Sequence, residues 1–221
     1  MISRGTNGRP AGPKRDQART RLARAAVVDA ARTLFLERGY GATTVEAISE
    51  LADVPPATVY RLFASKHGIL QSLLDVSIVG DDGELTMADR PAVRSLLDDP
   101  DPAAQLSGFV GVVAQVNTRV APVHRILVSA AAVEADAAAL LDRVTQQRQQ
   151  GQRAIARSLA RAGSLRPGLR ERDAADVIHA LLSPELFRLL VLDRGWKTER
   201  YERWLAQLLV DQLLPAATAS S

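Results

Sequence analysis

The chain has 221 residues, of which 47% are hydrophobic and 24% charged, and this length and composition are typical of a soluble globular protein with a core of its own. It contains no cysteine, which excludes disulfides, thiolate metal sites and cysteine nucleophiles and agrees with a reducing, cytoplasmic location. Aromatic residues make up only 4% of the chain, whereas the strong helix formers alanine, leucine, arginine, glutamine and glutamate occur throughout it. The composition therefore predicts an all-α protein.

The net charge of +3 is unevenly distributed along the chain. Residues 1–21 contain six cations and one anion, residues 1–76 contain eleven and seven, and residues 77–221 contain 17 and 18. The basic N-terminal end suggests an anionic partner, either a nucleic acid or a membrane surface, although a basic tail can also be merely solvated. No apolar run approaches the ~18 residues of a membrane span, and none follows the N-terminal cations, so we expect neither a membrane protein nor a secretory signal.

The first predicted element is a helix that follows a basic arm. Residues 1–19 are rich in glycine, proline and arginine without a hydrophobic period, and we expect them to be disordered. From Thr20 to Arg38, apolar residues at positions 27, 30, 31, 34 and 35 follow the spacing of one helix face. Gly39 then ends this helix.

Two short helices are predicted next. Thr43 with Glu46 three residues later is typical of a capping box, and the second helix would run over residues 45–52. The side chains that it would bury are Val45, Ile48 and Leu51. The sequence Asp53-Val54-Pro55-Pro56 breaks the chain, because proline suits only the first turn of a helix. A third helix restarts near Pro56 and covers Ala57–Phe63.

Ser65 is expected to cap a fourth helix, which runs through Leu70 and Leu74 toward Ile78. The residues from Gly80 to Gly83 end it and mark the boundary between two functional regions.

Beyond this boundary, apolar periodicity and the positions of proline and glycine predict further helices. They cover roughly residues 92–97, 102–118, 122–132, 136–162, 173–194 and 198–214. No strand alternation or internal repeat occurs, and residues 215–221 form a small polar tail that we expect to be frayed.

Two short helices with a tight break between them, after a longer helix and a basic arm, are the outline of a helix-turn-helix module. On the third helix, Val59 and Phe63 lie four residues apart on one face, whereas Thr58 and Arg61 project elsewhere. We therefore expect one face of this helix to pack and the other to be free to contact DNA.

The residues around this helix match a known pattern. Leu34-Phe35-x-Glu37-x-Gly39-Tyr40-x-Ala42-Thr43-Thr44-Val45-x-x-Ile48 is followed by Thr58-Val59-Tyr60-x-x-Phe63-x-Ser65-Lys66. This pattern resembles the TetR family of transcriptional repressors. The resemblance implies a helix-turn-helix domain at residues 20–76, joined by its fourth helix to a larger helical ligand-binding and dimerisation domain at residues 84–214.

The resemblance also implies which residues contact DNA phosphates. Thr44 matches the family's cap of the second helix and would contact a phosphate, as would Thr58 and Tyr60. Lys66 matches the family's phosphate-contacting lysine, at a helix N-terminus whose field favours an anion.

Base contacts are implied for Pro56, Ala57 and Arg61, on the exposed side of the third helix, where Arg61 would address guanine through two acceptors in the major groove. The sequence departs from the family at residues 53–55, where Asp-Val-Pro stands in place of the common Gly-Val-Ser. Glu46 either accepts a hydrogen bond from cytosine or serves as the capping-box partner, and we favour the cap.

Three arginines near the start of the first helix have two possible roles. Arg19, Arg21 and Arg24 either follow the phosphate backbone or make the surface more soluble. Phe35 and Tyr40, by contrast, are expected in the core.

The function that the resemblance implies is transcriptional repression, by a homodimer that binds a palindromic operator on double-stranded DNA and is released by a small-molecule effector. Residues 102–162 would line the effector pocket, and the few charged positions on their apolar faces favour a hydrophobic ligand. The helices at 173–194 and 198–214 would form the dimer interface. Their apolar positions are Leu181, Leu182, Leu189, Leu190, Trp204, Leu205, Leu208 and Leu209.

Competing function classes lack support. The motifs GxxxxGK, GxGxxG, HExxH and GxSxG are absent, and His67, His124 and His179 are widely separated, so we expect no catalysis, cofactor or metal site. His124 either faces a pocket or is a hydrogen-bonded structural residue, which we favour, and His179 is expected in the core or an interface. The tryptophans near acidic residues do not indicate a membrane-surface helix, and the basic arm lacks the interleaved aromatics of RNA-binding segments.

Overall fold

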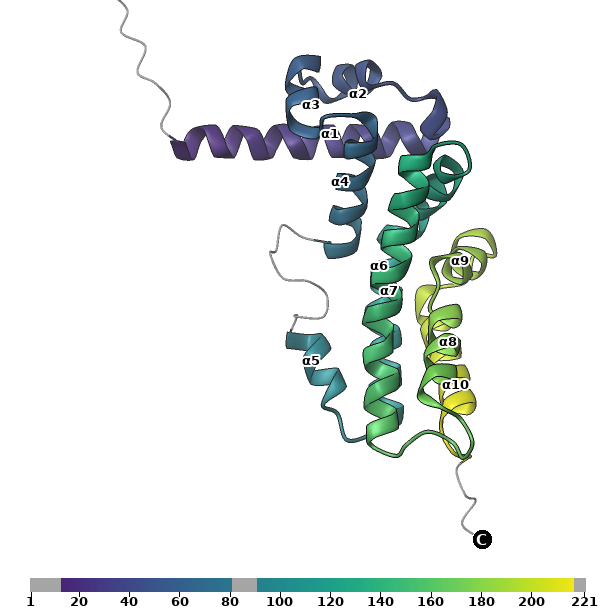
Figure 1. The fold of residues 1–221 in the computed structure, drawn as a ribbon. Coiled ribbons are helices and arrows are strands. Elements are labelled where there is room, and N and C mark those ends of the chain that lie inside the picture. Colours follow the sequence, from purple (N-terminus) through teal and green to yellow (C-terminus); the bar gives the residue numbers. More distant parts are fainter. Residues whose placement is uncertain (1–12, 81–90, 217–221) are drawn as a thin grey trace, which may run out of the picture. The chain divides into compact units, whose positions relative to one another are not determined.

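The computed structural model describes residues 13–80 and 91–216, and all the regular elements in these two ranges are helices (Figure 1). This confirms the predicted all-α class. The chain divides into two compact units between Leu73 and Leu74, and the predicted domain limits of 20–76 and 84–214 stay predictions. The rest of the predicted arm, turn and tail, at residues 1–12, 81–90 and 217–221, lies outside the described residues. None of the described helices is long and apolar enough to cross a membrane.

The first helix, α1 (Pro13–Ala42), begins earlier than predicted. Residues 13–19, which we expected to belong to a disordered arm, form its first turns. Proline suits the first position of a helix, and the alanine, arginine and glutamine residues that follow have high helix propensity, so a helix forms here without an apolar face. The apolar positions further along are buried as predicted, namely Val27, Ala30, Ala31, Leu34 and Phe35. The regular helix is interrupted where predicted, at Gly39, whose φ is 80° and ψ 164°.

The capping of α2 (Val45–Ala52) confirms the cap at Thr44 that the resemblance implies and contradicts the capping box predicted from Thr43. Thr44, not Thr43, is the N-cap, and its hydroxyl oxygen accepts the Ala47 N–H at 3.1 Å. Thr43 is buried and donates to the Gly39 carbonyl oxygen at 2.8 Å. A capping box between Thr43 and Glu46 is therefore wrong, because the residue three positions after the Thr44 cap is Ala47, which has no polar side chain to complete the box.

Of the three side chains predicted to be buried on α2, two are buried and one is exposed. Val45 and Ile48 are buried, but Leu51 is 53% exposed. Ser49 takes the third buried position, where its hydroxyl donates to the Val54 carbonyl oxygen. The turn after α2 passes over this side of the helix, so a hydrogen-bonded serine fits there and Leu51 points to solvent.

A tight turn leads into α3 (Pro56–Phe63). Asp53 adopts the left-handed conformation with φ 52°, and the Pro55 carbonyl oxygen accepts the Val59 N–H at 3.1 Å. The helix therefore has a defined start although it lacks the serine cap of the family pattern. Val59 and Phe63 are both buried, as predicted.

The helix α4 (Lys66–Val79) follows α3 after a turn at residues 64 and 65, in which Ala64 has a φ of 63°. The Ser65 hydroxyl oxygen accepts the Gly68 N–H at 3.2 Å, which confirms the predicted cap. A Cβ atom at position 68 would lie 1.9 Å from the Phe63 carbonyl oxygen. Only glycine permits so close an approach of the two helices.

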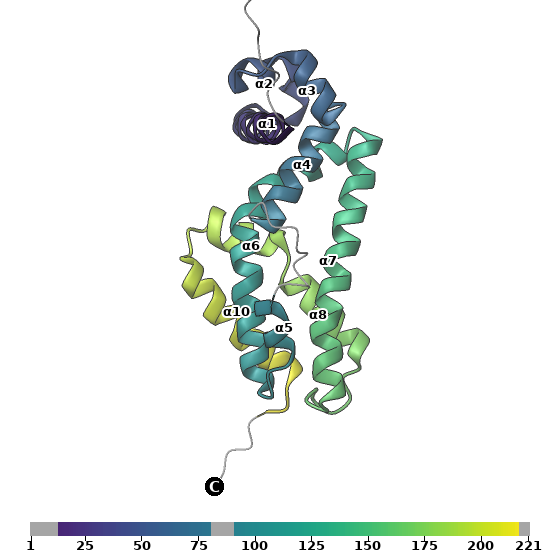
Figure 2. The same cartoon turned by 90° about the vertical axis from the view of Figure 1, so that its left-hand side faces the viewer.

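The second unit is built around two long helices, α6 (Pro102–Ala131) and α7 (Ala135–Arg161), which lie side by side (Figure 2). The short helix α5 (Pro91–Leu97) packs on both of them. The core that they share with the later helices includes Leu106, Phe109, Ile155, Leu159, Ile178, Phe187, Tyr201, Leu205 and Leu209.

The helix α8 (Glu171–Leu181) packs on α7, and α10 (Thr198–Leu213) packs on α6. Along the chain, α8 and α10 are separated by α9 (Pro184–Phe187) and the π-helix η2 (Arg188–Asp193). The single helix predicted over residues 173–194 is therefore wrong. Ser183 caps α9 by accepting the Leu186 N–H at 3.2 Å, and Pro184 occupies the first helical position, so this Ser-Pro pair starts a new helix.

At Pro122 the structure has a continuous helix where the sequence predicts a break. We predicted that this proline separates two helices, but α6 continues through it. An internal proline costs about 3 kcal/mol. Burial on both sides offsets this cost, because Val120, Val123 and Leu127 are at most 4% exposed, and each such side chain contributes about 1.5–3 kcal/mol.

Candidate functional site

The residues predicted to contact DNA all lie on the first unit, around α2 and α3 (Figure 1). Those with exposed side chains are Thr44, Pro56, Ala57, Tyr60 and Arg61, whereas Thr58 and Lys66 are half-buried. Because the opposite side of α3 is buried, the exposed side chains of this helix, Pro56, Ala57, Tyr60 and Arg61, project from a fixed face. The major groove of DNA admits an α-helix, and a helix with such an exposed face could contact the base edges there.

Lys66 has a structural contact as well as its predicted one. Its Nζ donates to the Tyr40 carbonyl oxygen at 3.0 Å and lies 4.2 Å from the centroid of the Tyr40 ring. The Tyr40 ring is buried, as predicted, and lies 5.2 Å from the Phe35 ring. Lys66 therefore joins the start of α4 to the end of α1.

Tyr60 and Glu46 are connected across the exposed surface. The Tyr60 hydroxyl donates to Glu46 Oε1 at 3.2 Å. Desolvation and the neighbouring Glu46 carboxylate raise the pKa of Tyr60, so the phenol stays protonated and remains a donor. Sequence reasoning missed this pair, because it assigned Tyr60 to a phosphate and Glu46 to a helix cap or a cytosine. Since Thr44 is the N-cap of α2, Glu46 does not serve as the capping-box partner.

Among the arginines of α1, Arg24 differs from Arg19 and Arg21. Arg24 Nη1 donates to the Leu62 carbonyl oxygen at 2.8 Å, and its guanidinium carbon lies 4.6 Å from the centroid of the Phe63 ring. Arg24 thus binds the C-terminal end of α3. Arg19 and Arg21 have exposed side chains.

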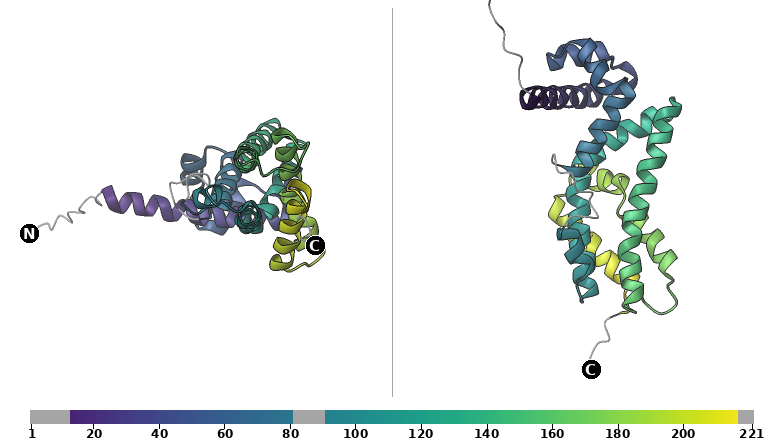
Figure 3. Two further views of the ribbon diagram at one scale, coloured as in Figure 1. Left: turned by 90° about the horizontal axis from the view of Figure 1, so that it is seen from below. Right: turned by 60° about the vertical axis from the view of Figure 1, so that its left-hand side comes forward.

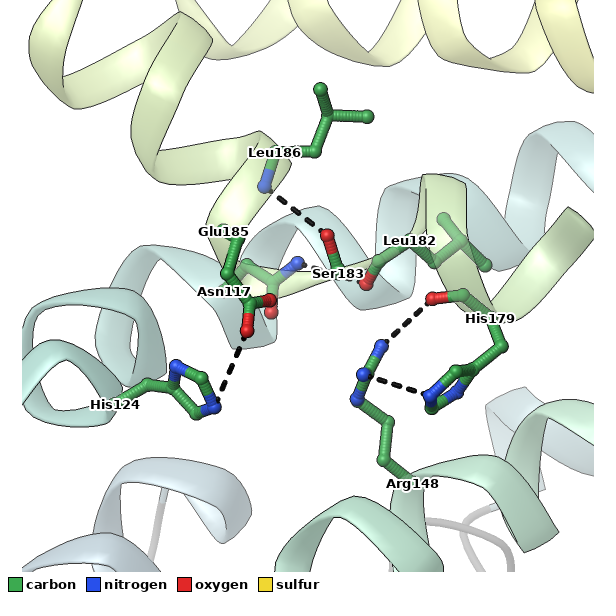
Figure 4. Close-up of polar contacts among 8 residues, drawn as sticks. All are labelled: Asn117, His124, Arg148, His179, Leu182, Ser183, Glu185 and Leu186. Carbon is green, nitrogen blue, oxygen red and sulfur yellow. Dashed lines mark hydrogen bonds and ion pairs between the residues drawn. The ribbon is translucent and has the colours of Figure 1, made fainter. Parts of the chain in front are cut away.

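A second polar site lies in the region where the resemblance implies an effector pocket (Figure 4). Arg148 Nη1 donates to the His179 carbonyl oxygen at 2.9 Å, and Arg148 Nη2 lies 3.0 Å from His179 Nε2. His179 Nδ1 lies 2.8 Å from Gln152 Oε1. Because a guanidinium only donates, His179 accepts at Nε2 and donates from Nδ1, and its ring is neutral.

This polar site lies at the break between α8 and α9. The carbonyl oxygens of His179 and Leu182, at the end of α8, accept from Arg148 and from Asn117 Nδ2, the latter at 3.4 Å. Carbonyls at a helix C-terminus lack partners within the helix, and a cation there is favoured by the helix dipole. Nearby, His124 Nε2 lies 3.8 Å from Glu185 Oε1.

The outcome for the histidines is mixed. His124 is buried beside Glu185, in agreement with a structural role, whereas His179 is only half-buried and holds a polar network. Sequence reasoning missed Asn117 and Gln152. Both are polar residues at positions in phase with the buried face of their helix, and this phase was the available clue.

We expect the stability of the second unit to decrease when the pH falls below about 6.5. Burial lowers the pKa of His124 and of His179 from the ordinary value of 6.5; Arg148 lowers both further, and Glu185 opposes the change. The unfolded chain therefore binds more protons than the folded one at mildly acidic pH. The stabilisation is complete above the unfolded pKa and is lost as the pH falls through the folded values.

The measurement is urea unfolding at about pH 7.5 and about pH 5.5. A His124→Gln, His179→Gln variant serves as control and should show a smaller difference between the two midpoints. Equal differences in the variant and the wild type would show that the two imidazoles do not cause the effect.

Comparisons with known proteins agree with this geometry. Residues 27–73 match the family described as bacterial regulatory proteins, tetR family. The HTH-type transcriptional regulator TcmR of Streptomyces glaucescens is 37% identical over 87 residues, which are 39% of this chain and 38% of TcmR. The uncharacterized HTH-type transcriptional regulator YvkB of Bacillus subtilis (strain 168) is 44% identical over 48 residues, or 22% of this chain and 25% of YvkB. The matches thus span well under two thirds of either relative.

Solved structures match nearly the whole chain. NalD, the secondary repressor of the MexAB-OprM multidrug efflux pump in Pseudomonas aeruginosa, has a TM-score of 0.68 at 22% identity, covering 90% of this chain and 100% of NalD. The SmeT–triclosan complex has a TM-score of 0.68 at 17% identity, covering 88% of this chain and 93% of SmeT. At these identities the likeness shows the fold. The family match and the curated relatives thus identify the helix-turn-helix segment at residues 27–73 as that of the tetR family of bacterial regulatory proteins, and the solved structures share the overall fold.

Proposed function

We propose that this protein is a transcriptional repressor that binds a palindromic operator as a homodimer and is released by a small molecule. The observation that carries the proposal is the exposed face of α3, where Ala57, Tyr60 and Arg61 project from a helix that Val59 and Phe63 anchor in the core. In this proposal α3 lies in the major groove and Arg61 pairs with guanine. Thr44, Thr58, Tyr60 and Lys66 hold phosphates on either side, and Pro56 lies close to the bases.

The dimer in this proposal forms through the last helices. Leu189 and Leu192 on η2 are each 48% exposed, and Trp204 on α10 is 37% exposed. An open groove also runs along α10, lined by Arg200, Arg203, Trp204, Gln207, Leu208 and Asp211. Exposed apolar side chains on successive elements favour a protein partner, and a second copy of the chain presents the same surface in a twofold dimer. Leu182, Leu205 and Leu209 belong instead to the core of their own unit.

The experiment that tests this function is selection of bound duplexes from a random DNA library with the full chain. We expect enrichment of a near-palindrome whose half-sites lie about 10 base pairs apart, or a multiple of this, because two symmetric α3 helices must enter successive major grooves. Failure to enrich any sequence, with the protein folded and dimeric, would refute sequence-specific binding.

Release by an effector is proposed to act through α4. Arg119 of α6 holds the end of this helix, since its Nε donates to the Ser77 carbonyl oxygen at 3.1 Å and its Nη2 to that of Ile78 at 3.4 Å. A hydrophobic ligand bound between the helices of the second unit would move α6 and, through Arg119, tilt α4. The two α3 helices of the dimer would then no longer match successive grooves.

We expect effector and operator each to weaken the binding of the other by the same factor, usually equivalent to about 1–3 kcal/mol, because linkage is reciprocal. A ligand found by thermal-shift screening would be titrated by calorimetry with and without operator. Arg119→Gln should reduce the factor, whereas Arg125→Gln, an exposed arginine on the same helix, should leave it unchanged. Identical ligand affinities with and without operator would contradict the coupling.

A further inference from the structure

The helix α1 has two parts with different surroundings. From Val27 onward it contributes to the core of the first unit, and the match to the family begins at the same residue. The preceding part, residues 13–26, extends beyond the other helices of this unit (Figures 1 and 3). None of its side chains described from residue 17 to 26 is buried, and Leu22 is 68% exposed. In this extension, residues 13–26, the described side chains therefore do not serve to build the core.

The extension holds positive charge that the helix-turn-helix segment, residues 27–73, lacks. Residues 13–26 contain five cations and one anion, whereas residues 27–73 contain four cations and five anions. The helix-turn-helix segment by itself is thus slightly negative. Contacts to phosphates supply a large part of the affinity of proteins for DNA, so an anionic segment needs cations from elsewhere in the chain.

The extension is also held in a fixed direction relative to α3. Arg24, within the extension, binds the Leu62 carbonyl oxygen at 2.8 Å and Ser72 Oγ at 3.4 Å. These contacts connect the base of the extension to the C-terminal end of α3 and to α4. At about 1.5 Å per residue, the helix from position 24 to position 13 spans about 16 Å, which is the length of about five base pairs.

We propose that the extension is a second DNA-contacting element, which binds phosphates of the duplex outside the segment read by α3. Arg19 and Arg21, whose side chains are exposed, make these contacts, whereas Arg24 positions the helix. The partner is double-stranded DNA because its two strands present phosphates on both sides of a groove, which suits Arg19 and Arg21, since side chains two residues apart on a helix project about 200° from one another. The proposal rests on the DNA-binding function above and adds to it a longer and more salt-dependent footprint.

The test compares the wild-type full chain with an Arg19→Gln, Arg21→Gln variant on the selected operator and on an unrelated duplex. Glutamine keeps the helix propensity and removes both charges. We expect the slope of log affinity against log salt to become shallower by about two, at about 0.9 per phosphate contact, with the same loss on both duplexes. The control is Arg161→Gln, Arg172→Gln, which removes two exposed cations from the second unit and should leave the slope unchanged.

Hydroxyl-radical footprinting locates the contacts. The wild type should protect backbone positions outside the half-sites, and the Arg19→Gln, Arg21→Gln variant should lose this outer protection alone. Equal slopes and footprints for the variant and the wild type would overturn the inference while the repressor function stands. Absence of specific binding by the wild type would refute the function itself. Stronger binding of the wild type to duplex RNA or to phosphatidylglycerol vesicles than to duplex DNA, lost in the variant, would also overturn it.

Discussion

A Leu189→Glu, Leu192→Glu variant is expected to be monomeric and to bind the operator about 10²–10⁴-fold more weakly than the wild type. Two half-sites bound by one dimer gain this factor, because the second contact is made at a high effective concentration. Both leucines lie on η2 and are 48% exposed, so the charges should disrupt a protein interface and leave the fold of each chain intact. The measurements are light scattering at micromolar concentration and binding to operators with one or two half-sites.

The matched control is Val133→Glu, which adds a charge at a side chain that is 79% exposed, in the link between α6 and α7. This variant should remain a dimer and bind both operators normally. If the double variant at Leu189 and Leu192 stays dimeric, the interface lies elsewhere. If it is monomeric and still prefers the two-site operator as strongly as the wild type, the proposed mode of binding is wrong.

Arg61→Ala is expected to relax the sequence preference at one base pair of each half-site. An arginine that binds both acceptors of guanine contributes about 1–3 kcal/mol of discrimination, which corresponds to about 5–150-fold. Arg61 has an exposed side chain, so its removal should leave the fold unchanged. Repeating the library selection with the variant measures the effect position by position.

Lys66→Ala provides the contrast, because a phosphate contact carries no sequence information. It should weaken binding to all duplexes and reduce the salt slope by about one. Since Lys66 Nζ also binds the Tyr40 carbonyl oxygen, the thermal stability of this variant must be measured in parallel. An unchanged selection profile for Arg61→Ala would show that Arg61 does not read a base.

Much of the helix-turn-helix module was predictable from local sequence. The burial of Val59 and Phe63, the interruption at Gly39 and the cap at Ser65 all agree with the structure. Each depends on residues at most four positions apart, or on the backbone freedom of a single glycine. Features that depend on such short sequence separations follow from local sequence alone.

The helix boundaries that failed depend on a balance of free energies. Pro122 is destabilising in any helix, but the burial on both sides of it outweighs that cost. At Ser183-Pro184 the local preference for a new helix prevails, because Asn117 and Arg148 from other helices satisfy the freed carbonyl groups of α8. Local sequence contains the cost of each break but not the compensating contacts.

The composition and apolar spacing thus determined the helical class, the helix-turn-helix module and the exposed face of α3. Only the tertiary structure assigned the partners of polar and charged side chains: Glu46 to Tyr60, Arg24 to the end of α3, and Arg148 to His179. The physical reason is the separation of the interacting residues along the sequence. Apolar periodicity repeats within each helix, whereas a hydrogen bond between residues 14–38 positions apart exists only after the helices have packed.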